Sequence, residues 1–102
     1  MSIQEFAKKA LKFRNDRKWA KYHNPKDSSM ALIAEAAELL EHFKWRRAKE
    51  MEKYIKNHKI EIAEELSDVL YWVLVMANDL KIDLDSAFLK KLKKNQIKYP
   101  LK

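Results

Sequence analysis

Two acidic motifs, each set in an otherwise apolar segment, constrain this chain more than any other feature of its sequence. The first pair, Glu35 and Glu38, lies in the run Met30–Leu40, whose other residues are all apolar. Because side chains three positions apart share one face of a helix, both carboxylates point the same way. Burying neighbouring carboxylates is costly unless something compensates their charge. The natural partner is a hard cation that prefers oxygen ligands.

The second acidic pair repeats this arrangement further along the chain. Glu65 and Asp68 are again three residues apart, and Asp68 is followed directly by the apolar run Val69–Ala77. Two helices that each carry such a pair can face one another and bring four carboxylates together. That arrangement is typical of a magnesium site that handles a polyphosphate.

The composition bounds what surrounds these motifs. A chain of 102 residues, of which 47% are hydrophobic, predicts a single small domain over residues 1–102. There are no cysteines, which excludes disulfides and thiolate metal sites. The segment Met1–Ala10 is amphipathic and lacks the apolar centre of a signal peptide. No apolar run approaches the roughly 20 residues that a membrane span needs. We therefore expect a cytoplasmic protein with no membrane contact.

Apolar residues recur at helical spacing along four segments. These segments cover residues 2–20, 28–47, 60–78 and 84–97. Pro25 disfavours helix at the preceding residue, so we expect Asp27 or Ser28 to cap the second helix and Asp83 to cap the fourth. Residues 46–59 are highly charged and predict a loop or a short helix. Because the alternation typical of strands is missing, the sequence predicts an all-α, four-helix bundle.

The apolar surface of these helices also predicts how the chain assembles. In the last helix we expect Leu84, Ala87, Phe88 and Leu92 to face the core. The helix that contains Asp68 is apolar nearly all round, which indicates burial on more than one side. A chain of this length has little left to cover that surface. We therefore predict a homodimer or homotetramer, with the site between the two acidic helices.

The acidic motifs resemble those of the MazG-like all-α nucleoside triphosphate pyrophosphohydrolases, most of all the dCTP pyrophosphatase-like branch. That family carries a Glu-x-x-Glu, a spacer and a Glu-x-x-Asp, which correspond here to Glu35–Glu38 and Glu65–Asp68. Further similarity covers residues 13–25, 43–45 and 91–100. The glycines usual beside the first acidic pair are Ala34 and Ala37 here, and alanine is still small enough for close helix packing.

This resemblance implies a reaction and a metal. Glu35, Glu38, Glu65 and Asp68 would bind Mg²⁺, with Mn²⁺ as a possible substitute. A nucleoside triphosphate would be hydrolysed between its α and β phosphates to the monophosphate and pyrophosphate. Bound magnesium neutralises phosphate charge and lowers the pKa of water. Among the carboxylates we favour Glu38 as the group that orients or deprotonates the attacking water, and Asp68 as a fixed ligand.

The resemblance also implies residues that contact the nucleotide. Lys91 and Asn95 match the family's contacts to phosphate and sugar, although both also suit an ordinary helix surface. Four further side chains match positions near the nucleobase pocket: Trp19, His23, Trp45 and Trp72. Aromatic rings stack on any base, which explains the residue type without naming the base. Taken singly, each tryptophan also fits a place in the core.

Two other functions fit parts of the sequence. The net charge of +7 fits either a solvated lysine surface or attraction of an anion. A basic helical module that binds nucleic acid or protein without catalysis is the main alternative, but no recognisable reading helix supports a nucleic-acid partner. A di-iron bundle needs Glu-x-x-His motifs, and neither acidic pair is followed by a histidine in register.

Overall fold

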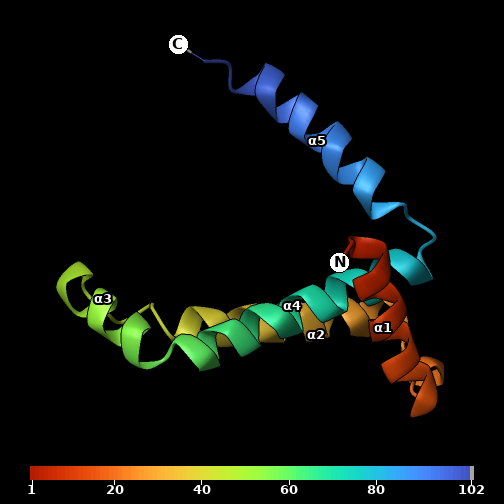
Figure 1. Cartoon of the computed structure of the whole chain (residues 1–102), viewed down its shortest axis with the longest axis horizontal. Coiled ribbons are helices and arrows are strands. Elements are labelled where there is room, and N and C mark those ends of the chain that lie inside the picture. Colours follow the sequence, from red (N-terminus) through yellow and green to blue (C-terminus); the bar gives the residue numbers. More distant parts are fainter. Residues whose placement is uncertain (102) are drawn as a thin grey trace.

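The computed structural model describes residues 1–101, and every regular element in that range is helical (Figure 1). The elements are α1 (Ile3–Asp16), a 3₁₀ turn η1 (Ala20–Tyr22), α2 (Pro25–Glu41), α3 (Ala48–Asn57), α4 (Lys59–Asp79) and α5 (Leu84–Lys98). The all-α fold class predicted from the sequence is confirmed. In the described part of the chain, none of these helices combines the length and apolar character that a bilayer span requires.

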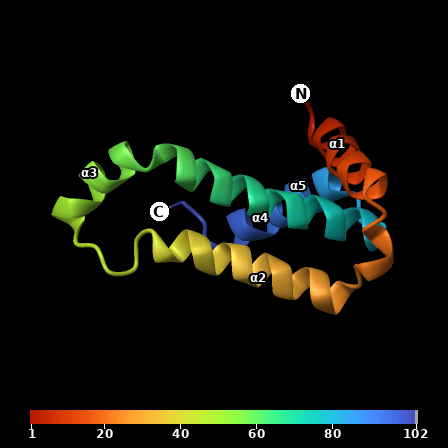
Figure 2. The ribbon, with the colours of Figure 1, turned by 90° about the horizontal axis from the view of Figure 1, so that it is seen from below.

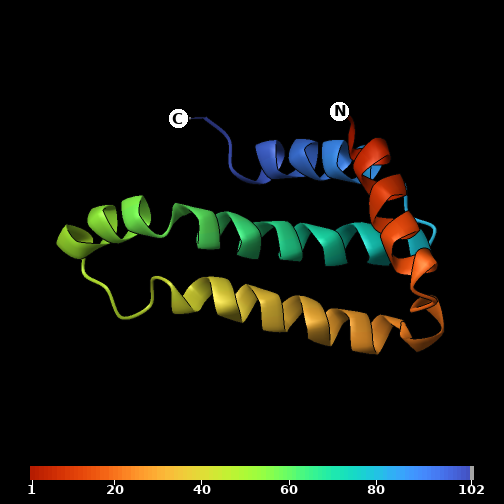
Figure 3. The same cartoon turned by 60° about the horizontal axis from the view of Figure 1, so that its bottom comes forward.

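The centre of the fold is the antiparallel pair of α2 and α4, which lie side by side over most of their length (Figures 2 and 3). The predicted cap of α2 was wrong, because the helix begins earlier, at Pro25. Asn24 is the cap, and its side chain accepts a hydrogen bond from the Asp27 amide at 2.9 Å. Proline suits the first helical position, since its fixed φ is already helical and the missing N–H has no partner there. The helix ends at Glu41 rather than at residue 47.

Helix α1 crosses the C-terminal end of α4 (Figures 1 and 3). The Arg14 guanidinium forms an ion pair with Asp79 at 2.8 Å, which ties the two helices together. Nearby on α4 lie Leu74 and Val75, the two buried apolar side chains among residues 1–101. The chain leaves α1 through Lys18, whose φ of 58° is left-handed, and then forms η1.

Helix α3 covers most of residues 46–59, so the short helix is the correct one of the two predictions for this segment. It lies at the far end of the α2–α4 pair and leads directly into α4 (Figure 1). Its anchor is Tyr54, whose hydroxyl lies 2.6 Å from His42 Nδ1. The Tyr54 ring stacks on His58 at 4.0 Å between centroids, and the Arg46 guanidinium lies 3.4 Å from the ring centroid. These contacts fix the charged segment against the ends of α2 and α4.

Helix α5 runs away from the other helices after a turn through Lys81, whose φ is 56° (Figure 1). Its predicted cap is confirmed, because Asp83 accepts a hydrogen bond from the Ser86 amide at 3.3 Å. The prediction that its apolar residues face the core was wrong for this chain alone. Phe88 is 61% exposed and Leu92 is 42% exposed. No helix within residues 1–101 covers them, since α5 meets the rest of the fold only near its start.

Candidate functional site

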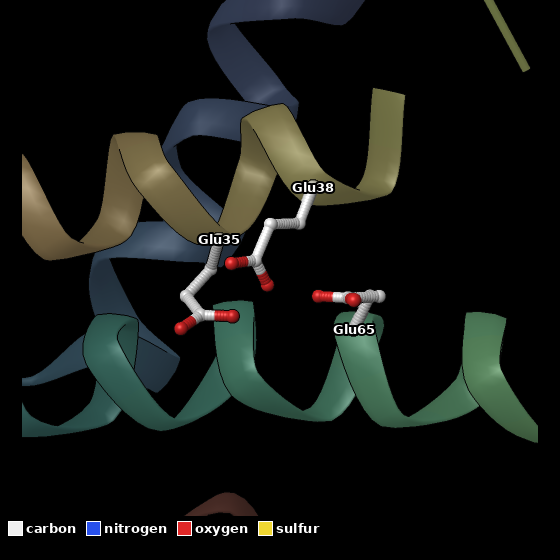
Figure 4. Close-up of side chains that lie close together, drawn as sticks. All are labelled: Glu35, Glu38 and Glu65. Atoms are coloured by element: carbon white, nitrogen blue, oxygen red, sulfur yellow. The ribbon is translucent and has the colours of Figure 1, made fainter. Parts of the chain in front are cut away.

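Three carboxylates converge between α2 and α4. Glu35 and Glu38 project from α2 toward α4, and Glu65 projects from α4 toward them (Figure 4). One carboxylate oxygen from each of the three lies within 4.8 Å of the others. The three-residue spacing on α2 places its two acids on adjacent turns of one face, and the antiparallel packing supplies the third from the opposite helix. The structure therefore brings the two acidic motifs together, as their spacing predicts.

The surroundings of these acids penalise their negative charge. Glu35 Oε2 and Glu65 Oε2 are buried and have no hydrogen-bond partner among the described residues. Burial raises the pKa of Glu35 to about 7, with the charges of Asp68, Glu38 and Glu65 acting in the same direction. Burial also raises the pKa of Glu65, as do its contact with Glu38 and the charges of Glu38 and Asp68, whereas nearby His42 lowers it. Removing this penalty requires a proton or a cation.

Asp68 completes the acidic set from a different position. It is exposed and lies outside the group of three, but it lines the same cleft as Glu35. The candidate metal ligands are therefore all carboxylate oxygens, and two of these oxygens are buried without a hydrogen-bond partner. Hard divalent cations such as Mg²⁺ and Mn²⁺ prefer such ligands. The residues present fit a divalent metal ion.

A cleft of about 400 Å³ opens beside the acids, a volume within the range of small-molecule sites. Its lining combines the two acids Glu35 and Asp68 with aromatic side chains from α1, from α4 and from the two residues that flank η1. These are Phe13, Trp19, His23, Tyr71 and Trp72.

The aromatic rings hold one another in place. Phe13 meets Trp19 and Tyr71 edge to face, with ring centroids 5.6 Å and 6.1 Å apart. Trp72 lies 5.2 Å from Tyr71 and 5.1 Å from His23. Such edge-to-face arrangements suit the charge distribution of aromatic rings and stabilise the packing. The aromatic lining is therefore formed before any ligand enters.

The structure separates the predicted nucleotide-contacting residues into two groups. Trp19, His23 and Trp72 line the cleft. Trp45 follows α2 and is 80% exposed, while Lys91 and Asn95 lie on α5, so none of these three lines the cleft of its own chain. A single chain therefore brings three of the six predicted nucleotide-contacting residues together in one cleft.

Two lining residues were missed. Tyr71 lies three positions after Asp68, so the helical spacing that grouped the acids also places this ring on their face. Burial raises the pKa of its hydroxyl, while Arg14 and Arg17 lower it. Phe13 belongs to the apolar stripe of α1, and nothing local distinguishes it from an ordinary core residue.

Comparison with known proteins gives matches of three kinds. The model of the MazG-like family matches residues 31–102. The chain is 30% identical over 101 residues to human dCTP pyrophosphatase 1, covering 97% of this chain and 59% of that protein. It is 28% identical to the dCTP pyrophosphatase 1 of Bos taurus over 102 residues, covering 98% of this chain and 60% of the relative. The chain thus spans about 60% of the length of these relatives.

A solved structure is also similar. The crystal structure of a pyrophosphatase from Archaeoglobus fulgidus superposes with a TM-score of 0.89 and 36% sequence identity. The match covers 96% of this chain and 92% of the other. The likeness therefore extends over the helices that form both the acidic cluster and the aromatic lining.

Proposed function

The chain belongs to the MazG-like family, and we propose that it is a magnesium-dependent nucleoside triphosphate pyrophosphohydrolase. The reaction would convert a deoxynucleoside or nucleoside triphosphate to the monophosphate and pyrophosphate, with dCTP or a modified nucleotide as candidate substrates. One observation carries the proposal: the cleft that holds the aromatic rings is also lined by Glu35 and Asp68. A base that contacts the rings therefore has its phosphates beside the acids.

The proposed metal ligands are the four acids of the two motifs, Glu35, Glu38, Glu65 and Asp68. Bound magnesium would neutralise charge on the phosphate oxygens and lower the pKa of water. The buried, unpartnered oxygens of Glu35 and Glu65 support this assignment. Manganese has similar ligand preferences and is the expected substitute.

Glu38 is the proposed general base. It lies between Glu35 and Glu65 in the cluster and is more exposed than either. In this position it orients water for attack on the α phosphorus and accepts the proton that the water loses. The bond between the α phosphorus and its bridging oxygen breaks as the new P–O bond forms, and pyrophosphate leaves with that oxygen.

The aromatic lining is the proposed base-binding surface. Trp19 and Trp72 offer ring faces and edges to a nucleobase, and His23 offers a polar group beside them. Stacking of this kind tolerates several bases. The substrates would come from the nucleotide pool, and we accordingly place the protein in the cytoplasm.

A homo-oligomer is part of the proposal because α5 leaves apolar surface open. A groove of about 570 Å³ lies between its start and the α1 and α4 helices. Exposed Phe88, Leu89 and Leu92 continue this surface along α5. We propose that a second copy covers it in a dimer or tetramer, since burying such area stabilises by about 25 cal/mol per Å². Lys91 and Asn95, and the exposed Trp45, would then serve the site of a neighbouring copy.

The assembly is tested by light scattering on the purified protein. Phe88→Asp should lower the molar mass toward that of one chain, because a charge on the apolar face opposes its burial. Lys90→Asp places the same charge on the polar side of α5 and should leave the mass unchanged. A wild-type protein that is a monomer at micromolar concentration would contradict the oligomer without touching the proposed reaction.

The reaction is tested with a panel of nucleoside triphosphates incubated with and without Mg²⁺. We expect the monophosphate and pyrophosphate in equal amounts, and no product in EDTA. Formation of a diphosphate and inorganic phosphate would place the cleavage elsewhere. If no triphosphate is cleaved and the protein instead binds duplex DNA in EDTA with a strong salt dependence, the basic binding module replaces this proposal.

A further inference from the structure

Arg14 is buried, with only 5% of its surface exposed, although it lies on the amphipathic helix α1. Its Nη1 donates to Asp79 at 2.8 Å, and the same nitrogen lies 3.5 Å from His23 Nδ1. Burial works to raise the pKa of Asp79, but the hydrogen bond and charge of Arg14 outweigh it, so the pKa is lowered. An ion pair with Asp79 explains how the charge is tolerated. It does not explain why His23 lies against the same nitrogen.

The chemistry of this contact decides which nitrogen of His23 carries its proton. A guanidinium group has only N–H donors and accepts no hydrogen bond. A proton on His23 Nδ1 would therefore face the positive charge of Arg14. The favoured neutral form leaves Nδ1 bare as an acceptor and places the proton on Nε2. Arg14 thus selects one tautomer of His23.

The position of the ring gives this tautomer a consequence. His23 separates two hollows, one lined by Arg14 and Asp79 and the other by the aromatic rings and the acids. Nδ1 is occupied by Arg14, and the same ring lines the aromatic cleft with its centroid 5.1 Å from that of Trp72, so a proton on Nε2 is the one left for a ligand in that cleft. The cleft therefore has an N–H donor beside its stacking surface.

We propose that Arg14 is a positioning residue that holds His23 as a hydrogen-bond donor to the nucleobase. The acceptor on the ligand would be a carbonyl oxygen or an unprotonated ring nitrogen of the base. The identity of the ligand rests on the proposed function, but the tautomer does not. Arg14 acts through His23 and has no direct contact with the reaction in this account.

The role of Asp79 makes the proposal specific. Without Arg14, the Asp79 carboxylate would be left as the nearest charged group on that side of His23. An ionised carboxylate accepts hydrogen bonds and has no proton to donate. It would favour a proton on Nδ1, the opposite tautomer. Loss of Arg14 should thus invert the hydrogen-bonding character of the nitrogen that faces the cleft, from donor to acceptor.

The first test is a two-bond ¹H–¹⁵N NMR spectrum of the histidine side chains in the protein without nucleotide. In the wild type we expect His23 with the proton on Nε2, and in Arg14→Gln a shift of population toward Nδ1. Lys12→Gln removes a cation from an exposed ion pair of the same helix and should leave the His23 signals unchanged. A wild-type His23 with its proton on Nδ1 overturns the proposal whether or not Arg14→Gln folds.

The second test measures kinetics on the best triphosphate of the panel. Arg14→Gln should raise KM by about five- to tenfold, the range for losing one neutral hydrogen bond, with kcat changed less than about twofold. His23→Gln keeps an amide donor at the position of Nε2, so Arg14→Gln should have no further effect on KM in that background. An equal effect in both backgrounds would show that Arg14 only supports the fold. If no triphosphate is cleaved, the proposed function fails while the NMR result still decides the tautomer.

Discussion

The acidic and aromatic halves of the cleft are stabilised in opposite ways. Burial and the charges of neighbouring acids raise the pKa values of Glu35 and Glu65, and one buried oxygen of each has no partner within the described chain. The aromatic rings on the other side contact one another edge to face and leave the cleft open between them. The aromatic half is thus preformed by packing, whereas the charge of the acidic half must be offset by a proton or a cation.

The two halves also differ in their origin along the chain. All four acids fall within residues 31–102, the range matched by the MazG-like family model. Phe13, Trp19 and His23 precede that range and reach the cleft through α1 and the turn after it. We therefore expect changes in the acidic half to affect the chemical step and changes in the aromatic half to affect substrate binding.

The largest expected effect is on the chemical step. Glu38→Gln keeps the shape of the side chain but removes the proposed base, and we expect kcat to fall by about 10²- to 10⁴-fold. Nucleotide binding, measured with a nonhydrolysable triphosphate, should fall by far less than kcat, because three of the four proposed metal ligands remain. Glu41→Gln is the matched control, since Glu41 lies one turn further along α2 and pairs with Lys44 on the surface. A variant that retains full activity would remove Glu38 from the reaction.

The next effect concerns binding by the aromatic half. Trp72→Ala should raise KM by about tenfold or more, because stacking on one base contributes roughly 1–3 kcal/mol. Its affinity for Mg²⁺ without nucleotide should be that of the wild type. Tyr22→Ala removes an exposed aromatic ring from the η1 turn and should leave KM unchanged. A Trp72 variant that lost metal binding as well would show that the two halves are not separable.

The pH dependence of stability should report the charge of the acidic half. The pKa of Glu35 rises from 4.5 to about 7 on folding, so between these values the folded state binds more protons than the unfolded state. The metal-free protein should therefore become less stable as the pH rises from 4.5 to 7. Added Mg²⁺ should reverse that trend by replacing the proton. Thermal unfolding of the wild type and Glu35→Gln checks this, and an equal loss of stability in both would assign the effect elsewhere.

The smallest effect is expected at the turn that carries the aromatic half. Lys18 adopts a φ of 58° immediately after α1, and Trp19 donates from there to the Arg14 carbonyl at 3.2 Å. Lys18→Gly should raise the free energy of unfolding by about 0.5–1 kcal/mol, since glycine reaches this conformation without a steric penalty but loses more chain entropy on folding. Urea unfolding measures the difference. No change in kcat should accompany it.

Local sequence signals predicted much of the fold and the acidic cluster. The spacing of Glu35 with Glu38, and of Glu65 with Asp68, predicted one acidic face on each of two helices. The need to compensate their charge predicted that these faces lie together, and Glu35, Glu38 and Glu65 do converge. Asp83 was recognisable as a cap because it directly precedes an apolar helical stripe. For the cap of α2, the prediction relied on the rule that the residue before a proline disfavours helix. It missed that proline itself is well suited to the first position of a helix.

The remaining features depend on contacts between distant residues. The ion pair of Arg14 and Asp79 joins positions 65 residues apart, and neither residue has a neighbour in sequence that signals the other. Hydrophobic periodicity places Phe88 on an apolar face of α5. It does not indicate whether that face packs against the same chain or against another molecule. The anchoring of α3 through Tyr54 likewise depends on His42 and Arg46, which the periodic pattern does not connect to it.

The central claim is that the acids of α2 and α4 are brought together to bind a divalent ion. The most direct measurement is calorimetric titration of Mg²⁺ into the nucleotide-free protein near pH 7, in two buffers of different ionisation enthalpy. We predict binding with release of protons, because Glu35 is partly protonated there, and loss of that binding in Glu65→Gln. Absence of Mg²⁺ binding, or binding that releases no proton and survives Glu65→Gln, would contradict the account.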